Sequence, residues 1–285
     1  MQSLYNETKF IMNKYNITAN KSLGQNFLIS EEAVNAIVDS ADITKQDLII
    51  EIGPGLGTLT ERLLEKAGKV VCIELDTRMV NIITERFALY DNIEIINNDV
   101  LKVDLQELIK EKKQAHNLQN AKVVANLPYY ITTPIIMKLL EDKLDIQSIT
   151  IMIQKEVAQR LIAKPGDSLS GAITYGIHYY TEPENVTEVS RDAFIPAPEV
   201  DSQVIKLNIR KEPAVAVQDE EKLFKIIKLA FMQRRKTLIN GLTNGNMYTK
   251  QEIEEILQKM GLDLRIRGEK LTLEQYAEIV KHLDD

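Results

Sequence analysis

The tetrapeptide Asn126-Leu127-Pro128-Tyr129 follows the apolar run 123–125, and its residue types could act on the exocyclic amine of an adenine. Such an amine is a poor nucleophile because its lone pair is delocalised into the ring. If the side-chain oxygen of Asn126 and the carbonyl of Leu127 accept its two hydrogens, the nitrogen becomes more tetrahedral and can attack a methyl group. Pro128 shapes the turn so that these oxygens converge, and Tyr129 offers a face on which a flipped base can stack. We predict that these four residues are catalytic and that Tyr129 also binds the substrate; the alternative is a purely structural turn.

A glycine-rich turn, Gly53-Pro54-Gly55-Leu56-Gly57, follows the apolar run 48–52. Glycines allow a sharp turn and let a ligand approach the main chain. A turn at the carboxyl end of a first strand lies where doubly wound folds bind nucleotides. The spacing is G-x-G-x-G, whereas dinucleotide dehydrogenases carry G-x-G-x-x-G.

Two carboxylates end further apolar runs. Glu74 can accept hydrogen bonds from both ribose hydroxyls of an adenosine moiety. Asp99 can accept from the exocyclic amine of its adenine, while a neighbouring backbone amide such as that of Val100 serves a ring nitrogen. This set accommodates S-adenosylmethionine as well as NAD, and the turn at Asn126 favours S-adenosylmethionine.

The elements that must position these residues alternate between strand and helix patterns. Short β-branched runs predict strands, and apolar spacing predicts a helix over 58–67. The predicted strands are 48–51, 70–74, 93–96, 123–125, 149–153 and a late strand over 203–209. We therefore predict an α/β fold with a mostly parallel sheet, helices on both faces and antiparallel closing strands. A charged linker over 210–220 and helical patterns beyond it predict two domains, 1–211 and 212–285.

Composition limits the partners. The net charge of −7 argues against a protein that coats nucleic acid nonspecifically, but it allows a local basic face. We predict that Arg234, Arg235 and Lys236, helical by pattern, contact phosphates; an ordinary solvated helix face is the alternative.

The single cysteine, Cys72, indicates a buried thiol in a reducing compartment, and we expect a cytoplasmic protein without a membrane span. No His, Cys or Asp cluster has metal-ligand spacing, so we expect no metal.

Several motifs together resemble the bacterial 16S (small-subunit) ribosomal RNA adenine N6,N6-dimethyltransferase family. They are the glycine turn and the segments 21–28 (KSLGQNFL), 126–133 (NLPYYITT), 194–198 with 200–202 (FIPAP, VDS) and 231–238 (FMQRRKTL). The resemblance covers nearly the whole chain. It implies a class I S-adenosylmethionine-dependent methyltransferase fold, Rossmann-like with a seven-stranded sheet, and a small C-terminal all-α domain. It also implies four methyl transfers to two adjacent adenines near the 3′ end of 16S rRNA, on a late small-subunit assembly intermediate.

The same resemblance assigns roles to single residues. Asn26 and Leu28 are similar to a lid segment over the methionine end of the cofactor, and Gly53 to a backbone contact. Glu74 resembles the ribose binder and Asp99 the adenine reader. Asn126 corresponds to a residue that touches both cofactor and target amine, Tyr129 to the stacking residue, and Phe194 to a candidate for the opposite face of the base.

Other classes of protein stay open as alternatives. A large-subunit rRNA adenine methyltransferase of the macrolide-resistance type shares fold, cofactor and chemistry, but differs after the catalytic Pro-Tyr and in the C-terminal region. A noncatalytic ribosome-assembly factor is disfavoured by the intact tetrapeptide with Glu74 and Asp99. A nicotinamide dehydrogenase is disfavoured by the glycine spacing. We expect a monomer.

Overall fold

The computed structural model describes residues 3–20, 23–244 and 248–284. The chain folds into two compact units. The sheet unit comprises Met1–Ala158 and Glu184–Ile209, and the helical unit comprises Gln159–Pro183 and Arg210–Asp285. The domain boundary between residues 211 and 212 stays a prediction.

The centre of the sheet unit is a seven-stranded sheet with the order β4-β3-β2-β5-β6-β9-β7. The strands are β2 (Asp47–Ile52), β3 (Lys69–Glu74), β4 (Ile93–Asn97), β5 (Asn120–Asn126), β6 (Ser148–Gln154), β7 (Thr181–Val189) and β9 (Ser202–Ile209). Neighbours from β4 to β6 are parallel, and β9 runs antiparallel to β6. These findings confirm the predicted α/β class and an antiparallel closing strand.

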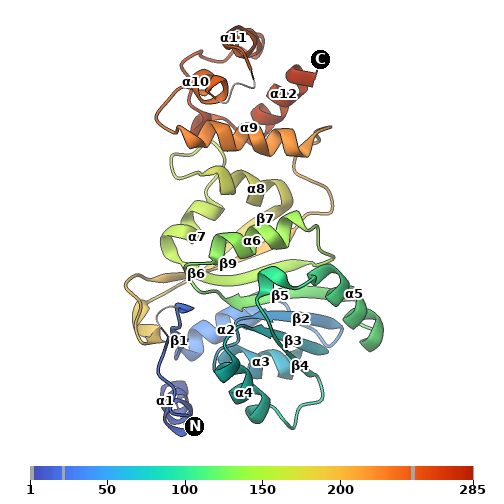
Figure 1. Ribbon diagram of the computed structural model, residues 1–285, viewed down its shortest axis with the longest axis vertical. Coiled ribbons are helices and arrows are strands. Elements are labelled where there is room, and N and C mark those ends of the chain that lie inside the picture. Colours follow the sequence, from blue (N-terminus) through green and yellow to red (C-terminus); the bar gives the residue numbers. More distant parts are fainter. Residues whose placement is uncertain (1–2, 21–22, 245–247, 285) are drawn as a thin grey trace. The chain divides into compact units, whose positions relative to one another are not determined.

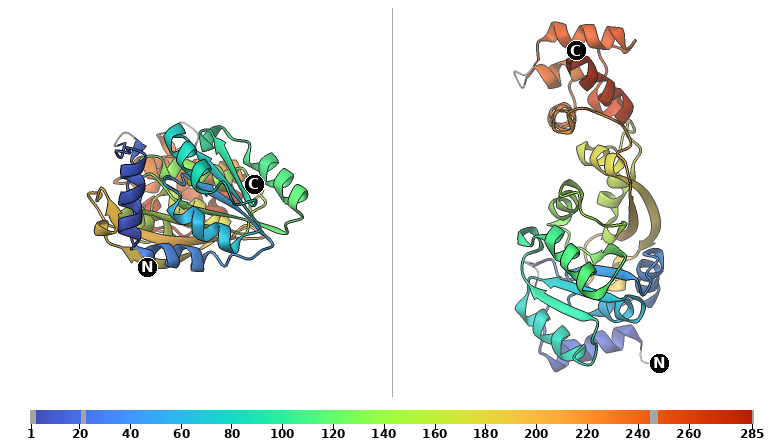
Figure 2. Two further views of the ribbon diagram at one scale, coloured as in Figure 1. Left: turned by 90° about the horizontal axis from the view of Figure 1, so that it is seen from below. Right: turned by 90° about the vertical axis from the view of Figure 1, so that its right-hand side faces the viewer.

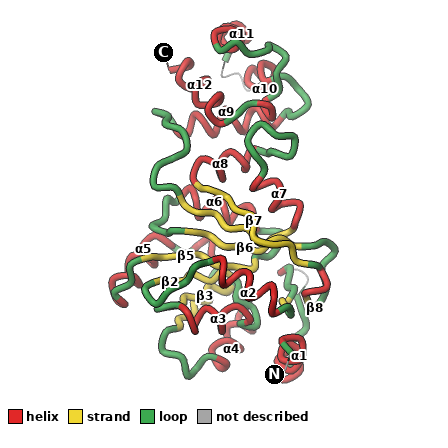
Figure 3. Tube along the Cα trace, turned by 180° about the vertical axis from the view of Figure 1, so that it is seen from behind, coloured by secondary structure: helices red, strands yellow, loops and turns green. Residues whose placement is uncertain are grey.

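Helices cover both faces of this sheet, which explains why the central strands are so apolar. Every residue of β2 and β3 is buried, as expected for parallel strands enclosed on two sides. Helices α5 (Leu105–His116) and α6 (Thr132–Glu141) lie over the face seen in Figure 1, whereas α2 (Glu31–Ser40) and α3 (Thr58–Lys66) lie over the face seen in Figure 3. Helix α4 (Thr77–Arg86) packs beside β3 and β4.

A second, two-stranded sheet brings distant segments together. Strand β1 (Phe27–Leu28) pairs antiparallel with β8 (Phe194–Ile195), with Leu28 opposite Phe194. The N-terminal helix α1 (Leu4–Lys14) supports this arrangement, because Ile11 packs in one apolar cluster with Phe27 and Leu56. Segments that are about 165 residues apart along the chain therefore meet next to the glycine turn.

The helical unit has its own apolar core. It contains α8 (Ala172–Tyr180), α9 (Glu220–Met232), α10 (Leu238–Thr243), α11 (Lys250–Lys259) and α12 (Leu273–Asp284), and α7 (Lys155–Ile162) crosses the division between the units. Figure 2 shows α9 to α12, in orange to red, gathered into one group. Tyr175 and Tyr276, both fully buried, meet edge to face with ring centroids 5.2 Å apart at the centre of this core.

One prediction in this region is wrong. Arg234, Arg235 and Lys236 are not helical, because α9 ends at Met232 and a turn follows. The amide of Lys236 donates to the carbonyl of Gln233 at 2.7 Å, and Thr237 then caps α10, so the backbone leaves the helical path between these residues.

Over the described ranges of the chain, no helix combines the length and apolar character that a membrane crossing needs.

Candidate active site

A cavity with about 1100 Å³ of empty space, counting the part open to solvent, lies at the carboxyl ends of β2 to β5. Since these strands are parallel, the residues that follow them meet at one edge of the sheet, where α/β folds bind ligands. The cavity is lined by most of the predicted site residues: Asn26, Leu28, Gly53, Glu74, Asp99, Val100, Asn126, Leu127, Pro128, Tyr129 and Phe194. The structure thus brings together side chains that the sequence scatters over about 170 positions.

Two of the three glycines in the glycine turn are needed for different structural reasons. Gly53 has φ +66°, and a Cβ at this position would meet nothing within 4 Å, so the open space beside it belongs to the cavity. Gly57 has φ +86°, and a Cβ there would lie 2.6 Å from the ring of Phe87. One glycine leaves room for a ligand, and the other allows α3 to start close against α4.

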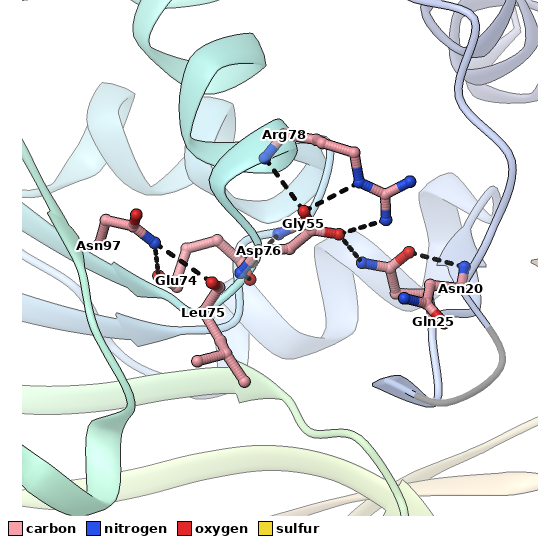
Figure 4. Close-up of polar contacts among 8 residues, drawn as sticks. All are labelled: Asn20, Gln25, Gly55, Glu74, Leu75, Asp76, Arg78 and Asn97. Atoms are coloured by element: carbon pink, nitrogen blue, oxygen red, sulfur yellow. Dashed lines mark hydrogen bonds and ion pairs between the residues drawn. The ribbon is translucent and has the colours of Figure 1, made fainter.

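Glu74 presents a fixed carboxylate to the cavity. Its Oε2 accepts the amide of Gly55 at 3.1 Å, and its Oε1 accepts the amide of Asp76 at 2.8 Å, as Figure 4 shows. Burial raises the pKa of Glu74, while the two backbone hydrogen bonds oppose that rise by stabilising the charged form. Each oxygen keeps further lone-pair capacity for a ligand hydroxyl.

A polar network next to Glu74 tethers the segment before β1 (Figure 4). The side-chain amide of Gln25 donates to Asp76 Oδ2 at 2.9 Å, and its oxygen accepts the amide of Asn20. Arg78 binds both oxygens of Asp76, with distances of 3.0 and 2.5 Å, and this contact lowers the pKa of Asp76. The Asp76–Arg78 pair thus anchors the segment that lines the cavity at residues 23–28. Lys21 and Ser22, which begin the motif 21–28, lie outside the described residues.

Asp99 and Val100 occupy the end of β4. Asp99 Oδ1 accepts the amide of Leu101 at 3.0 Å and so caps a short 3-10 turn, η2 (Val100–Lys102). Val100 is buried and lines the cavity. This cap holds the Asp99 carboxylate at the cavity wall and leaves one carboxylate oxygen for another donor.

The tetrapeptide at the end of β5 is held on both sides. The Leu127 amide donates to the Met152 carbonyl at 3.1 Å, which fixes the turn to β6. The Tyr129 phenol and the Ser202 hydroxyl lie 2.7 Å apart, and burial raises the pKa of Tyr129. Within the part of the chain that the structure describes, no group bonds to the side-chain amide of Asn126, so both ends of that amide can serve a ligand.

The sequence reasoning missed Glu51, which also lines the cavity. Its Oε2 accepts the Thr60 hydroxyl at 2.6 Å and the Cys72 thiol at 3.3 Å, whereas its buried Oε1 has no partner in residues 3–20, 23–244 and 248–284. Burial raises the pKa of Glu51 to about 7. The signal that could have found it is an acid within an otherwise apolar strand, two residues before the glycine turn.

Phe194 lines the cavity but is only 4% exposed, and it packs in the main apolar core with Leu28 and Val204. Its role as a face for a bound base stays a prediction. Other lining residues that the sequence reasoning did not single out include Leu75 and Tyr130, both half exposed.

The predicted phosphate-contacting residues belong to the helical unit. Arg234 bonds to the Glu269 carboxylate at 2.6 Å and to the Ser168 carbonyl at 2.5 Å, so it links parts of its own unit. Arg235 and Lys236 are exposed. Arg234 is exposed as well, although it is already paired within its unit, so contact of all three side chains with phosphates stays a prediction.

The arrangement fits transfer of a group to an amine: one wall offers fixed acids for a nucleoside, and another offers amide oxygens and an aromatic face. A search of the described residues finds no group of three or more His, Cys, Asp or Glu that could hold a metal ion.

Comparison with known proteins supports this chemistry. The model of the family described as ribosomal RNA adenine dimethylase matches residues 16–285. The ribosomal RNA small subunit methyltransferase A of Alkaliphilus metalliredigens is 48% identical, with coverage of 97% of this chain and 96% of that protein. The corresponding protein of Bacillus licheniformis is 46% identical over 97% and 95%.

Two solved structures share the fold over most of their length. A dimethyladenosine transferase from Plasmodium falciparum superimposes with a TM-score of 0.75 at 24% identity, and the match covers 90% of this chain and 97% of the transferase chain. The 23S rRNA methyltransferase ErmE superimposes with a TM-score of 0.70 at 25% identity, and the match covers 91% of this chain and 100% of the ErmE chain. The predicted methyltransferase fold is confirmed, and the family match over most of the chain establishes that this protein belongs to the ribosomal RNA adenine dimethylases.

Proposed function

We propose that this enzyme dimethylates the N6 amine of two adjacent adenosines near the 3′ end of 16S rRNA, with S-adenosylmethionine as the methyl donor. The observation that carries the proposal is the placement of Asn126-Leu127-Pro128-Tyr129 on the wall of the same cavity as Gly53 and Glu74. The relatives at 46–48% identity are small-subunit methyltransferases by name, which favours the small subunit over the large one.

The cavity suits S-adenosylmethionine. Gly53 leaves the space beside the main chain open, and the Glu74 carboxylate is held at the wall with lone pairs to spare for ribose hydroxyls. Asp99, with the backbone next to Val100, would bind the adenine, while Asn26 and Leu28 would cover the methionine end. When bound, the cofactor supplies an electrophilic methyl group on a sulfonium.

The chain's own groups activate the amine. In our proposal the Asn126 side-chain oxygen and the Leu127 carbonyl accept the two N6 hydrogens, which localises the nitrogen lone pair and aims it. Tyr129 stacks with the flipped adenine, and Pro128 fixes the turn between these groups. No strong base is needed, because the cationic amine formed by methylation loses its proton easily. Hydrogen-bond acceptors and orientation therefore account for catalysis here.

Recognition of the RNA would fall to further surfaces. We propose that exposed Arg235 and Lys236 contact phosphates, and that Arg234 positions the turn that carries them. The net charge of −7 fits docking on a structured ribosomal particle better than capture of naked RNA. We therefore also propose action late in small-subunit assembly, by a monomer, in the cytoplasm where ribosomes assemble.

The test is mass spectrometry of nucleosides after incubation with labelled S-adenosylmethionine. Undermethylated small subunits are the substrate, and large-subunit RNA runs alongside. We expect labelled N6,N6-dimethyladenosine in the small-subunit sample only. Label in the large-subunit RNA would favour the macrolide-resistance type of enzyme, and absence of label from both would favour a noncatalytic assembly factor.

A further inference from the structure

The side chain proposed to stack on the adenine is anchored to a strand that the chemistry above does not use. The Tyr129 phenol oxygen lies 2.7 Å from the hydroxyl oxygen of Ser202. Ser202 is fully buried at the start of β9, where it pairs with Gln154 of β6. Because a buried residue on a paired strand has little freedom to move, its hydroxyl is a fixed point beside the cavity.

Tyr129 needs such a fixed point. It lies in the turn between β5 and α6, outside any helix or strand, and it is only partly buried. Two side-chain torsions set the plane of its ring. The hydrogen bond to Ser202 holds the phenol oxygen and so fixes the first torsion, which places the long axis of the ring. It limits the second torsion only through the preference of a phenol hydroxyl for the ring plane, because the phenol oxygen lies on the axis of that rotation. Since stacked aromatic rings have preferred offset geometries, the position of the tyrosine ring determines where a stacked adenine lies relative to the Asn126 amide.

Asp201, the residue before Ser202, supports another part of the same cavity wall. Asp201 Oδ1 accepts the amide of Arg191 at 2.9 Å, and the Asp201 carbonyl accepts the amide of Lys155 at 3.0 Å. Arg191 opens the short turn that leads directly into Phe194, which lines the cavity. Two neighbouring residues of the Val200-Asp201-Ser202 motif therefore bond to the turns that carry both aromatic side chains.

We propose that Ser202 is a positioning residue for methyl transfer: through its hydrogen bond it fixes the position of the Tyr129 ring, and so the placement of the target adenine. Asp201 supports this role by holding the turn before Phe194. The inference rests on the proposed function, because it concerns the same base-binding wall. Ser202 itself does not touch the reacting atoms.

The experiment measures the single-turnover rate of methyl transfer to small subunits with cofactor and particles both saturating. The variants are Ser202→Ala, Tyr129→Phe and the double variant. Loss of one ordinary hydrogen bond predicts a rate about 5-fold lower for each single variant. The double variant should be no slower than either single one, because all three lack the same bond. The dissociation constant for S-adenosylmethionine should not change.

Ser148→Ala is the matched control. Ser148 is also a buried serine in the ladder between β6 and β9, but its hydroxyl has no hydrogen-bond partner among the residues that the structure describes. We expect a wild-type transfer rate from it, which separates loss of the bond to Tyr129 from loss of a buried hydroxyl as such. Ser202→Cys keeps a weaker hydrogen-bonding group, so it should give an intermediate rate, and it serves as the test if Ser202→Ala does not fold.

Three results would overturn the inference. A wild-type rate for Ser202→Ala, or for Ser202→Cys when Ala does not fold, removes the role of the hydroxyl. A slow Tyr129→Phe beside a normal Ser202→Ala means that the phenol acts on the RNA directly. A double variant about 25-fold slower means two independent effects. Failure of the proposed function is distinguishable, because the unsubstituted protein would then also transfer no methyl group to the small subunit.

Discussion

The buried acid Glu51 leads to a prediction about how stability depends on pH. Its side chain is 1% exposed, and burial raises its pKa from the ordinary 4.5 to about 7. Below pH 4.5 the carboxyl group is protonated in both the folded and the unfolded chain. Between pH 4.5 and 7 only the folded chain keeps the proton, so the free energy of unfolding falls as the pH rises through this window.

The magnitude follows from the size of that window. At about 1.4 kcal/mol per pH unit, the step from 4.5 to about 7 corresponds to a total loss of about 3 kcal/mol. Between pH 6 and pH 8 the part of the loss that remains is about 1 kcal/mol. The substitution Glu51→Gln removes the titration. The wild-type protein should therefore lose about 1 kcal/mol relative to this variant between the two pH values.

Equilibrium unfolding by urea, without cofactor, at pH 6 and pH 8 measures this difference. Titrating groups that do not interact with Glu51 contribute equally to both proteins, so they cancel in the comparison. Glu32→Gln, which removes an exposed acid on α2, controls for the change in net charge. If the difference between wild-type protein and Glu51→Gln is the same at both pH values, Glu51 does not carry a raised pKa and the reasoning fails.

Four further predictions concern the proposed sites. Asn126→Ala should abolish methyl transfer while calorimetry still detects cofactor binding; near-normal turnover would refute its role. Gly53→Ala should cost about 1 kcal/mol of stability, because φ is +66°, and should block cofactor binding, because its Cβ enters the cavity; unchanged affinity would contradict this. Gln25→Ala should weaken cofactor binding about 5-fold through loss of its bond to Asp76, and an unaltered dissociation constant would count against the anchor. Arg235→Ala should weaken particle binding and lower its salt slope by about 1, with cofactor affinity intact; equal affinity at every salt concentration would remove the phosphate contact.

The sheet was predictable because its strands carry their own signal. The runs that form β2 and β3 are continuous and apolar, as strands enclosed on both faces must be, and their ends identified the glycine turn and Glu74. Strand β7 carried no such signal, because most of its side chains are at least partly exposed and its sequence, TEPENVTEV, is polar. The two-residue strands β1 and β8 are too short for any periodicity, and their pairing depends on tertiary contacts.

The candidate site likewise contains residues that could be predicted from the sequence and residues that could not. Residues at strand ends could be predicted, because parallel strands bring their carboxyl ends to one edge whatever the details of packing. Glu51 could not be assigned in this way, since its unusual proton affinity depends on helices and strands that exclude water from both sides of β2. The bond between Tyr129 and Ser202 joins residues 73 positions apart, and no local pattern specifies it.

Arg234 and Arg235 show most clearly why residue type alone does not assign a role. They are adjacent, identical and equally basic, so the sequence offers no reason to treat them differently. Both are exposed, but the structure gives Arg234 a carboxylate and a carbonyl partner within its own unit, whereas no such partner of Arg235 is found among the described residues. An arginine whose charge Glu269 already balances gains less from a phosphate than one without such a partner. Substitution of Arg234 should therefore lower the stability of the helical unit, and substitution of Arg235 should weaken the binding of RNA. The role of each arginine is thus determined by the partners that the fold places around it.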